Sequence, residues 1–162
     1  MNPTPPTARS ADEQARLLHA LVELFEQRIA FNQTLGLRVL AAEPGDVRGC
    51  IEMRPELVGH YAHGRLHGGV ISATLDAMAG LALMVALAAR HPADSAEQVM
   101  QRFGRMGTID LRVDYLRPGL GPRFVALAEV TRLGGRIGST QMKLLDDAGQ
   151  LLATGAAAYV VS

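Results

Sequence analysis

The sequence lacks several features by which whole classes of protein are recognised. Its 162 residues include one cysteine, Cys50, and no tryptophan, and 16 basic side chains balance 16 acidic ones. A single cysteine excludes an internal disulfide framework and fits a reducing compartment, so we expect a cytoplasmic protein. Balanced charge without runs of one sign argues against a nucleic-acid partner or an anionic membrane surface. The first residues show no basic-then-apolar signal pattern.

The length and the 48% share of hydrophobic residues predict one domain with a substantial core. We assign it to residues 11–162, after a flexible lead of residues 1–10. Ser10 and Glu13 have the spacing of a capping box, and leucines then recur at helical spacing, which predicts a helix over 11–28. A further turn is expected over 31–35, ended by Gly36.

One long hydrophobic run extends from Gly69 to Ala89 and is followed by Arg90-His91-Pro92. The run is long enough to cross a bilayer. It contains Asp76, however, and lacks an aromatic belt or a cluster of basic residues at one end, which argues against a membrane span. We therefore interpret it as a helix that is buried in protein on all sides.

Alternating hydrophobicity and turn residues predict six strands, over residues 37–42, 47–53, 108–116, 124–132, 137–146 and 151–161. In the third of these, Ile109, Leu111, Val113 and Tyr115 are expected to share one face. Segments 54–66 and 93–107 are expected to be loops. Antiparallel hairpins with one long helix indicate an α+β domain, in which a curved sheet wraps the helix.

Three stretches resemble one family. "HGGVISATLDAMAG" is similar to the central-helix start of hotdog-fold acyl-CoA thioesterases of the phenylacetic-acid type, within the 4-hydroxybenzoyl-CoA thioesterase-like superfamily. There an Asp follows nine positions after the His of His-Gly-Gly, as Asp76 follows His67. "TIDLRVDYLRPGLG" resembles the next strand of that family, and "RLGGRIGST" resembles its following hairpin turn. The resemblance covers about residues 31–161 and implies the hotdog fold.

The resemblance implies hydrolysis of acyl-CoA by a homodimer or a homotetramer, with Asp76 as base or nucleophile. The first helical turn presents free N–H groups and a partial positive charge, so Gly68 is the expected oxyanion donor, and His67 would orient the carbonyl or the loop. Gly68 and Asp76 of one chain lie too far apart to share a carbon. The family's shared site across the dimer interface would resolve this.

Further substrate-binding residues are expected at Gly69, His60, Tyr61, Thr74, Arg117, Gly134 and Arg136. Many relatives have an Asn where this chain has His60 and Tyr61, so the role of that position is open. Arg117 and Arg136 match positions that meet the nucleotide end of coenzyme A, although both are equally plausible as solvated surface residues. Segment 93–107 either folds over the substrate mouth or is a plain surface insertion.

Other chemistries have weaker support in the sequence. His60, His63 and His67 lack a nearby Cys or second carboxylate, so no metal is expected, and no other cofactor is expected. Ser72 and Thr74 lack the strained elbow of a serine triad. Few aromatic residues favour a medium or long aliphatic acyl chain. The alternatives are a non-catalytic acyl-CoA-binding module and a hotdog dehydratase acting on 3-hydroxyacyl thioesters, although the usual dehydratase signatures are missing.

Overall fold

The computed structural model describes residues 8–162, and its N-terminal part is helical. Helix α1 (Ala11–Glu23) begins after Ser10, whose hydroxyl accepts a hydrogen bond from the Glu13 amide at 3.2 Å. A π-helical turn, η1 (Leu24–Arg28), continues it, and α2 (Ala30–Leu35) follows. Gly36 ends α2 with a φ of 69°, a left-handed conformation that favours glycine. The predicted helix, turn and stop are therefore confirmed, with a π turn inside the first helix.

The main sheet is antiparallel and has six strands in the order β1-β2-β6-β7-β8-β5. The strands are β1 (Arg38–Glu43), β2 (Asp46–Glu52), β5 (Gly107–Tyr115), β6 (Arg123–Leu133), β7 (Ile137–Asp146) and β8 (Leu151–Val160). Strands β1 and β5 form the two edges, and within residues 8–162 β5 pairs only with β8. All six predicted strands are present, with bounds that differ by at most one residue.

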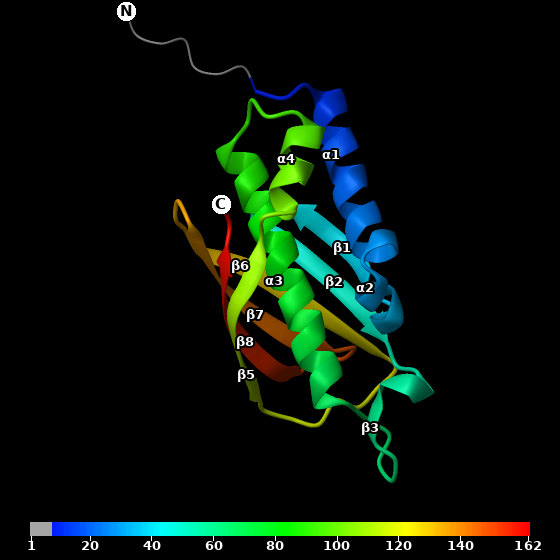
Figure 1. Ribbon diagram of the computed structural model, residues 1–162. Coiled ribbons are helices and arrows are strands. Elements are labelled where there is room, and N and C mark those ends of the chain that lie inside the picture. Colours follow the sequence, from blue (N-terminus) through cyan, green and yellow to red (C-terminus); the bar gives the residue numbers. More distant parts are fainter. Residues whose placement is uncertain (1–7) are drawn as a thin grey trace, which may run out of the picture.

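Helix α3 (Gly68–Arg90) runs across the inner side of this sheet, with α1 and α4 (Ala96–Phe103) beside its C-terminal half (Figure 1). Glycines in the sheet permit the close approach. A Cβ at Gly49 would lie 2.6 Å from the Met78 sulfur, and one at Gly138 would lie 2.4 Å from Leu83 Cδ2. Helix α3 is long and apolar enough to span a membrane, but 67% of its most apolar window is buried inside the molecule, as a core helix would be.

The two segments that were predicted to be loops contain short helices and strands. Segment 54–66 contains a 3-10 turn (η2, Pro55–Leu57) and a small hairpin of β3 (Val58–His60) and β4 (Arg65–Leu66). Segment 93–107 contains α4, whose start is fixed by a capping box between Ser95 and Gln98. Val99 of α4 is fully buried and α4 packs against α1, so this segment is part of the folded core rather than a plain surface insertion.

One β-strand prediction was also wrong. The pairing of β5 with β8 shifts between Thr108 and Asp110, which makes Ile109 the extra residue of a β-bulge. The bulge moves Thr108 to the inner side of the sheet, and Ile109 is 55% exposed instead of sharing the covered face with Leu111 and Val113.

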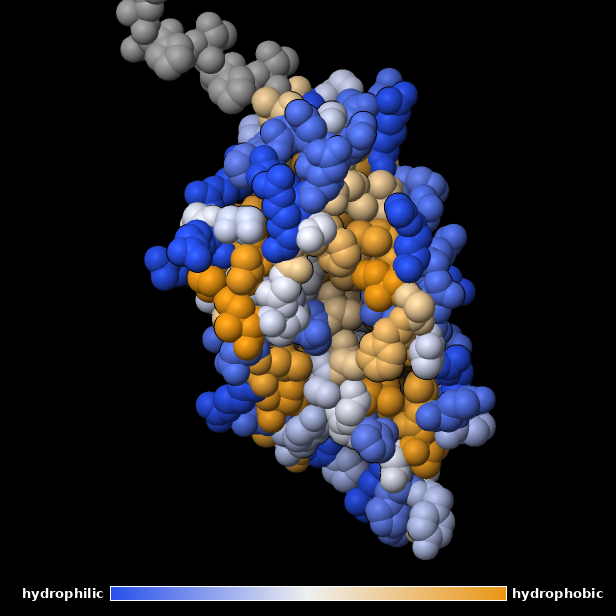
Figure 2. Space-filling view, in the orientation of Figure 1, coloured by the Kyte–Doolittle hydropathy of each residue, from blue (hydrophilic) through white to orange (hydrophobic). Residues whose placement is uncertain are grey.

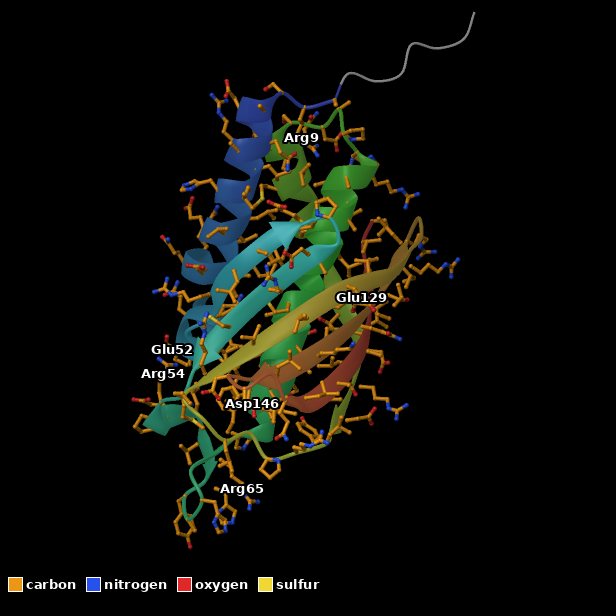
Figure 3. The ribbon with its side chains drawn as sticks, turned by 180° about the vertical axis from the view of Figure 1, so that it is seen from behind. Arg9, Glu52, Arg54, Arg65, Glu129 and Asp146 are labelled. Atoms are coloured by element: carbon orange, nitrogen blue, oxygen red, sulfur yellow. The ribbon has the colours of Figure 1, made fainter. Side chains whose placement is uncertain are left out.

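The chain is fastened to the C-terminal end of α3 by Arg9. Its guanidinium donates hydrogen bonds to the carbonyls of Ala88, His91 and Asp94, at 2.5, 2.8 and 2.8 Å. A cation here satisfies the Ala88 carbonyl of the last helical turn and interacts favourably with the helix dipole. Residues 1–7 of the predicted flexible lead lie outside the described residues. In Figure 3, Arg9 and Arg65 mark opposite ends of the molecule.

Candidate active site

Asp76 lies on a partly exposed face of α3, and two side chains from the sheet hold its carboxylate. The Thr108 hydroxyl donates to Oδ1 at 3.0 Å, and the Tyr159 hydroxyl lies 2.5 Å from the same oxygen. The Tyr159 oxygen is also 2.6 Å from the Asp76 carbonyl, so its single proton has two acceptors within reach. Oδ2 has no donor among residues 8–162 and is available for chemistry.

Tyr159 is a dependable proton donor in this arrangement. Burial and the hydrogen bond to Asp76 raise the pKa of its phenol far above the ordinary value of 10.0, because the ionised form would be poorly solvated and would face a carboxylate. The phenol therefore stays protonated across the range in which proteins function, and the hydrogen bond to Asp76 persists there.

The start of α3 forms the second part of the site. The His67 Nδ1 accepts a hydrogen bond from the Gly69 amide at 2.8 Å, so His67 caps the helix with its side chain. The Gly68 amide has no acceptor in the described part of the chain, and the Tyr115 hydroxyl donates to the Gly68 carbonyl at 3.1 Å. A free N–H at the positive end of a 23-residue helix is suited to bind a negatively charged oxygen.

The small hairpin of β3 and β4 is pressed against His67. A Cβ at Gly59 would lie 2.7 Å from the His67 Cα and 2.9 Å from its Cδ2, so only glycine fits there. Leu57 accepts a backbone hydrogen bond from the His67 amide at 2.9 Å. His67 is thus held by the loop that precedes it, and its capping bond in turn sets the direction of the first helical turn.

Gly68 and Asp76 of one chain do not form a single site. They are eight positions apart on one straight helix, which is about 12 Å at 1.5 Å per residue. A carbonyl oxygen bound at Gly68 would therefore lie beyond hydrogen-bond reach of the Asp76 carboxylate on the same chain.

The other expected substrate-binding residues fall into separate places. His60 and Tyr61 lie at the exposed hairpin end, where the ring of His60 stacks on Tyr61 and on His63 at centroid distances of 5.8 and 4.7 Å. Arg117 follows β5, near the Gly68 end, and donates to the Leu151 carbonyl at 2.8 Å. Gly69 is exposed in the first turn of α3.

Three of the expected substrate-binding residues do not lie on the molecular surface near Gly68: Thr74, Gly134 and Arg136. Thr74 is fully buried and donates to the Val70 carbonyl at 2.7 Å. Gly134 and Arg136 belong to the β6–β7 turn, where the Gly134 carbonyl accepts from Arg90 at 2.7 Å. Arg90 is 14 positions beyond Asp76, which is about 21 Å along the helix axis.

A hollow of about 370 Å³ lies on the outer face of the sheet, lined by residues such as Glu129 and Lys143. Figure 3 shows this face from behind, with Glu129 on it and α3 on the far side of the sheet. The hollow is therefore separated from Asp76 by the sheet. No group of three or more His, Cys, Asp or Glu side chains arranged to hold a metal occurs within residues 8–162. Cys50 is buried, and Arg123 donates to its sulfur at 3.3 Å.

Sequence reasoning missed the side chains that support the two parts of the site: Thr108, Tyr115 and Tyr159. Thr108 was hidden because the bulge at Ile109 reverses the alternation of β5. Tyr159 follows the small residues Gly155 and Ala157 on the inward face of β8. A lone tyrosine after small inward residues is a usable signal, because the space lets its ring reach toward the helix and its hydroxyl needs a polar partner.

A long central helix wrapped by a six-stranded antiparallel sheet is the hotdog fold, and Asp76 on that helix, held by two side chains of the sheet, gives it a candidate active site. Residues 63–153 match the family model of the thioesterase superfamily. The chain belongs to the thioesterase superfamily.

Individual relatives are similar to this chain over most of its length. The medium/long-chain acyl-CoA thioesterase YigI of Salmonella typhimurium is 39% identical over 92% of this chain and 95% of its own length. A Shewanella oneidensis structure related to the thioesterase superfamily has a TM-score of 0.88 at 37% identity, covering 94% of this chain and 100% of that one. A mutant of the phenylacetic acid degradation protein PaaI from Thermus thermophilus has a TM-score of 0.61 at 26% identity, covering 82% of this chain and 97% of that one.

Proposed function

We propose that this protein hydrolyses the thioester of medium- or long-chain aliphatic acyl-CoA to a free acid and coenzyme A. The observation that carries the proposal is a carboxylate anchored through Oδ1 with a free Oδ2, on a helix whose first amide is also free among the described residues. The names of the YigI relatives support the substrate class. The proposed chemistry uses no metal or redox cofactor, and the protein is expected in the cytoplasm.

In the proposed reaction the thioester carbonyl accepts a hydrogen bond from the Gly68 amide, which stabilises the oxyanion. Asp76 Oδ2 takes a proton from water as the water oxygen attacks the carbonyl carbon. The carbon–sulfur bond then breaks, and the coenzyme A thiolate receives that proton. In the alternative form, Oδ2 itself attacks the carbon, the carbon–sulfur bond breaks and coenzyme A leaves as the thiolate. Water then hydrolyses the resulting anhydride and supplies the proton that the thiolate takes up.

The proposed site joins Asp76 of one chain to Gly68 of a second copy. Strand β5 is a free edge, and its two ends carry the two anchors: Thr108 bonds Asp76 and Tyr115 bonds Gly68. Two β5 strands that pair antiparallel about their middles would set Thr108 of one opposite the Tyr115 end of the other. Each Asp76 would then face the other chain's Gly68, which gives two sites per dimer.

The exposed apolar side chains of β5 support pairing at this edge. Ile109, Tyr115 and the adjacent Leu116 are 55%, 54% and 50% exposed in a single chain. A free edge strand with exposed apolar residues favours pairing with another strand. A homotetramer would consist of two such dimers. In this proposal Arg117, His60 and Tyr61 contact the coenzyme A part of the substrate, and Gly134 and Arg136 take no part in the chemical step.

A panel of acyl-CoA substrates of increasing chain length tests the proposed reaction. We expect release of free thiol, followed with a thiol-reactive dye. Tight binding without thiol release would instead indicate an acyl-CoA-binding module. Loss or gain of water on 3-hydroxyacyl or enoyl thioesters without thiol release would indicate a dehydratase.

Mixed dimers test the shared site. Gly68→Pro removes the amide proton at the first helical position, where proline is tolerated, and His67 already has the extended ψ of 137° that precedes a proline. Gly68→Ala, which keeps the N–H, is the matched control. Gly68→Pro and Asp76→Ala should each be inactive alone, and random exchange of subunits should restore about a quarter of wild-type activity. No recovery after proven exchange would contradict a shared site.

A further inference from the structure

The face of α3 that carries Asp76 is open in its first half. Gly69, Ala73, Asp76 and Ala77 are partly or fully exposed, and they recur three and four positions apart, on one side of the helix. Gly80 continues the same side one turn later. Figure 2 shows this face of the molecule hollowed near α3, with hydrophobic residues around the hollow. Small side chains on α3 and apolar surroundings give the shape and polarity of a groove for an aliphatic chain.

Aromatic rings close this groove at Gly80. A Cβ built at Gly80 would lie 3.9 Å from Phe25 Cζ and 3.9 Å from Tyr159 Cε1, and Gly80 is buried. The Phe25 ring packs edge-on against Phe103, with a centroid distance of 5.8 Å and an interplanar angle of 69°. The closure is only four residues beyond Asp76, about 6 Å along the helix. An acyl chain that starts beside Asp76 therefore has room for only a few methylene groups.

The two phenylalanines differ in how firmly they are held. Phe25 is 1% exposed and lies within the core cluster. Phe103 is partly exposed, is the last residue of α4 and is followed by Gly104. Displacing Phe103 would disturb far less packing than displacing Phe25.

We propose that Phe103 is the movable backing of this aromatic end wall and determines the longest acyl chain that the enzyme accepts. This inference rests on the proposed thioesterase function. Short chains end before the Phe25–Phe103 pair. Longer chains need the Phe103 ring to turn away from Phe25, so that the Phe25 ring can tilt away from Gly80.

Two substitutions should move chain-length preference in opposite directions. Phe103→Ala removes the ring that backs Phe25, so the ratio of kcat/KM for hexadecanoyl-CoA to that for octanoyl-CoA should rise about tenfold, within the range that hydrophobic pockets achieve for methylene groups. Gly80→Val adds methyl groups in front of Phe25, so the same ratio should fall. Phe103→Leu should give an intermediate ratio.

Val99→Ala is the matched control, because Val99 is fully buried in the same helix and its truncation loosens α4 without removing the ring. Its ratio should equal that of the wild type. Circular dichroism and melting temperatures verify that each variant is folded. An unchanged ratio in folded Phe103→Ala and Phe103→Leu, or an equal shift in Val99→Ala, would overturn the inference.

Binding of free fatty acids separates this inference from the proposed function. Octanoate and hexadecanoate are titrated against wild type and Phe103→Ala by calorimetry. If the wild type releases no thiol from any acyl-CoA, the proposed function fails, yet Phe103→Ala should still favour hexadecanoate over octanoate relative to wild type. If thiol is released but neither the kinetic ratio nor the binding ratio changes, only the end-wall inference fails.

Discussion

The two halves of α3 are built for different tasks. From Leu81 to Val85 every side chain is buried, and α1 and α4 lie beside this half opposite the sheet (Figure 1). From Gly69 to Ala77 the corresponding side of the helix is uncovered in a single chain and carries glycine, alanine and one acid. One half of the helix therefore stabilises the fold, and the other half is left for a substrate and a second copy.

This difference shows how one element can combine stability with an exposed functional group. The buried half gains free energy from apolar surface removed from water, roughly 25 cal/mol for each Å². The open half forgoes part of that gain but keeps Asp76 accessible and held by Thr108 and Tyr159 from the sheet. Substitutions in the two halves should therefore separate loss of activity from loss of stability.

The largest expected effect is that of Asp76→Asn in the open half. The amide keeps the shape of the side chain and can still accept from Tyr159 and Thr108, so the fold should survive. It cannot act as base or nucleophile, so kcat should fall by about 10²–10⁴-fold. Steady-state kinetics measure the loss of activity and the melting temperature verifies the fold, and full activity in Asp76→Asn would refute the assignment.

A single turnover of the wild type in ¹⁸O-water tests for an anhydride that water cleaves at the Asp76 carbon. If Asp76 activates water, the label enters the released acid in the first turnover. If Oδ2 forms an anhydride and water attacks its Asp76 carbon, the label enters the protein instead. Mass spectrometry of the acid and of the peptide that contains Asp76 gives the answer.

Leu83→Ala in the buried half should have the opposite signature. Leu83 is fully buried beside Gly138, so the truncation leaves a cavity and should lower the free energy of unfolding by about 2–5 kcal/mol. At temperatures where the variant stays folded, kcat should remain near that of the wild type. Ala73→Ser in the open half is the contrasting control and should change stability by less than about 0.5 kcal/mol. Urea unfolding measures both.

Tyr159→Phe probes the contact between the sheet and the open half. We expect kcat to fall about tenfold or more with a smaller change in KM, because the phenol hydroxyl orients the Asp76 carboxylate. Burial raises the pKa of Tyr159 above its ordinary value of 10.0. The wild type should therefore lose no activity near pH 10 through ionisation of Tyr159. A purely structural role would lower stability and leave the kcat of folded protein unchanged.

The smallest effect concerns the helices that cover the buried half. The Glu13 carboxylate accepts from the Ala96 amide at 3.0 Å, which lowers the pKa of Glu13 below its usual 4.5 and links α1 to α4. The contribution of this hydrogen bond to the free energy of unfolding is complete at pH values above the unfolded-state pKa of Glu13. It is lost as the pH falls through the lower folded-state pKa of Glu13. Glu13→Gln should therefore lower the melting temperature slightly at pH 7 and show a weaker acid dependence than wild type.

The parts of this molecule that follow from local pattern could be predicted from the sequence, and the parts that depend on distant pairing could not. The apolar run indicated α3, and an acid within it indicated Asp76, because an acid in such a setting is rare. The partner of that acid, Tyr159, lies 83 positions away and was brought there only by the order of the strands. The bulge at Ile109 likewise depends on the register between β5 and β8.

Helix α4 was also missing from the sequence-based prediction, but for a different reason. The Ser95–Gln98 capping box was present as a local signal, and Val99 and Phe103 follow at helical spacing. The polar composition of segment 93–107 outweighed that signal. Composition was a poorer guide than spacing, because a short helix needs only one buried face.

The bonds from Arg9 to the last turn of α3 have a practical consequence for handling the protein. They fix the point at which the chain enters the fold at the end of α3 remote from Gly68, about 34 Å away for a helix of 23 residues. An affinity tag, fluorophore or surface tether attached ahead of Arg9 would be attached at the end of α3 remote from His67. Immobilised or labelled protein should accordingly be usable for turnover and subunit-exchange assays without redesign.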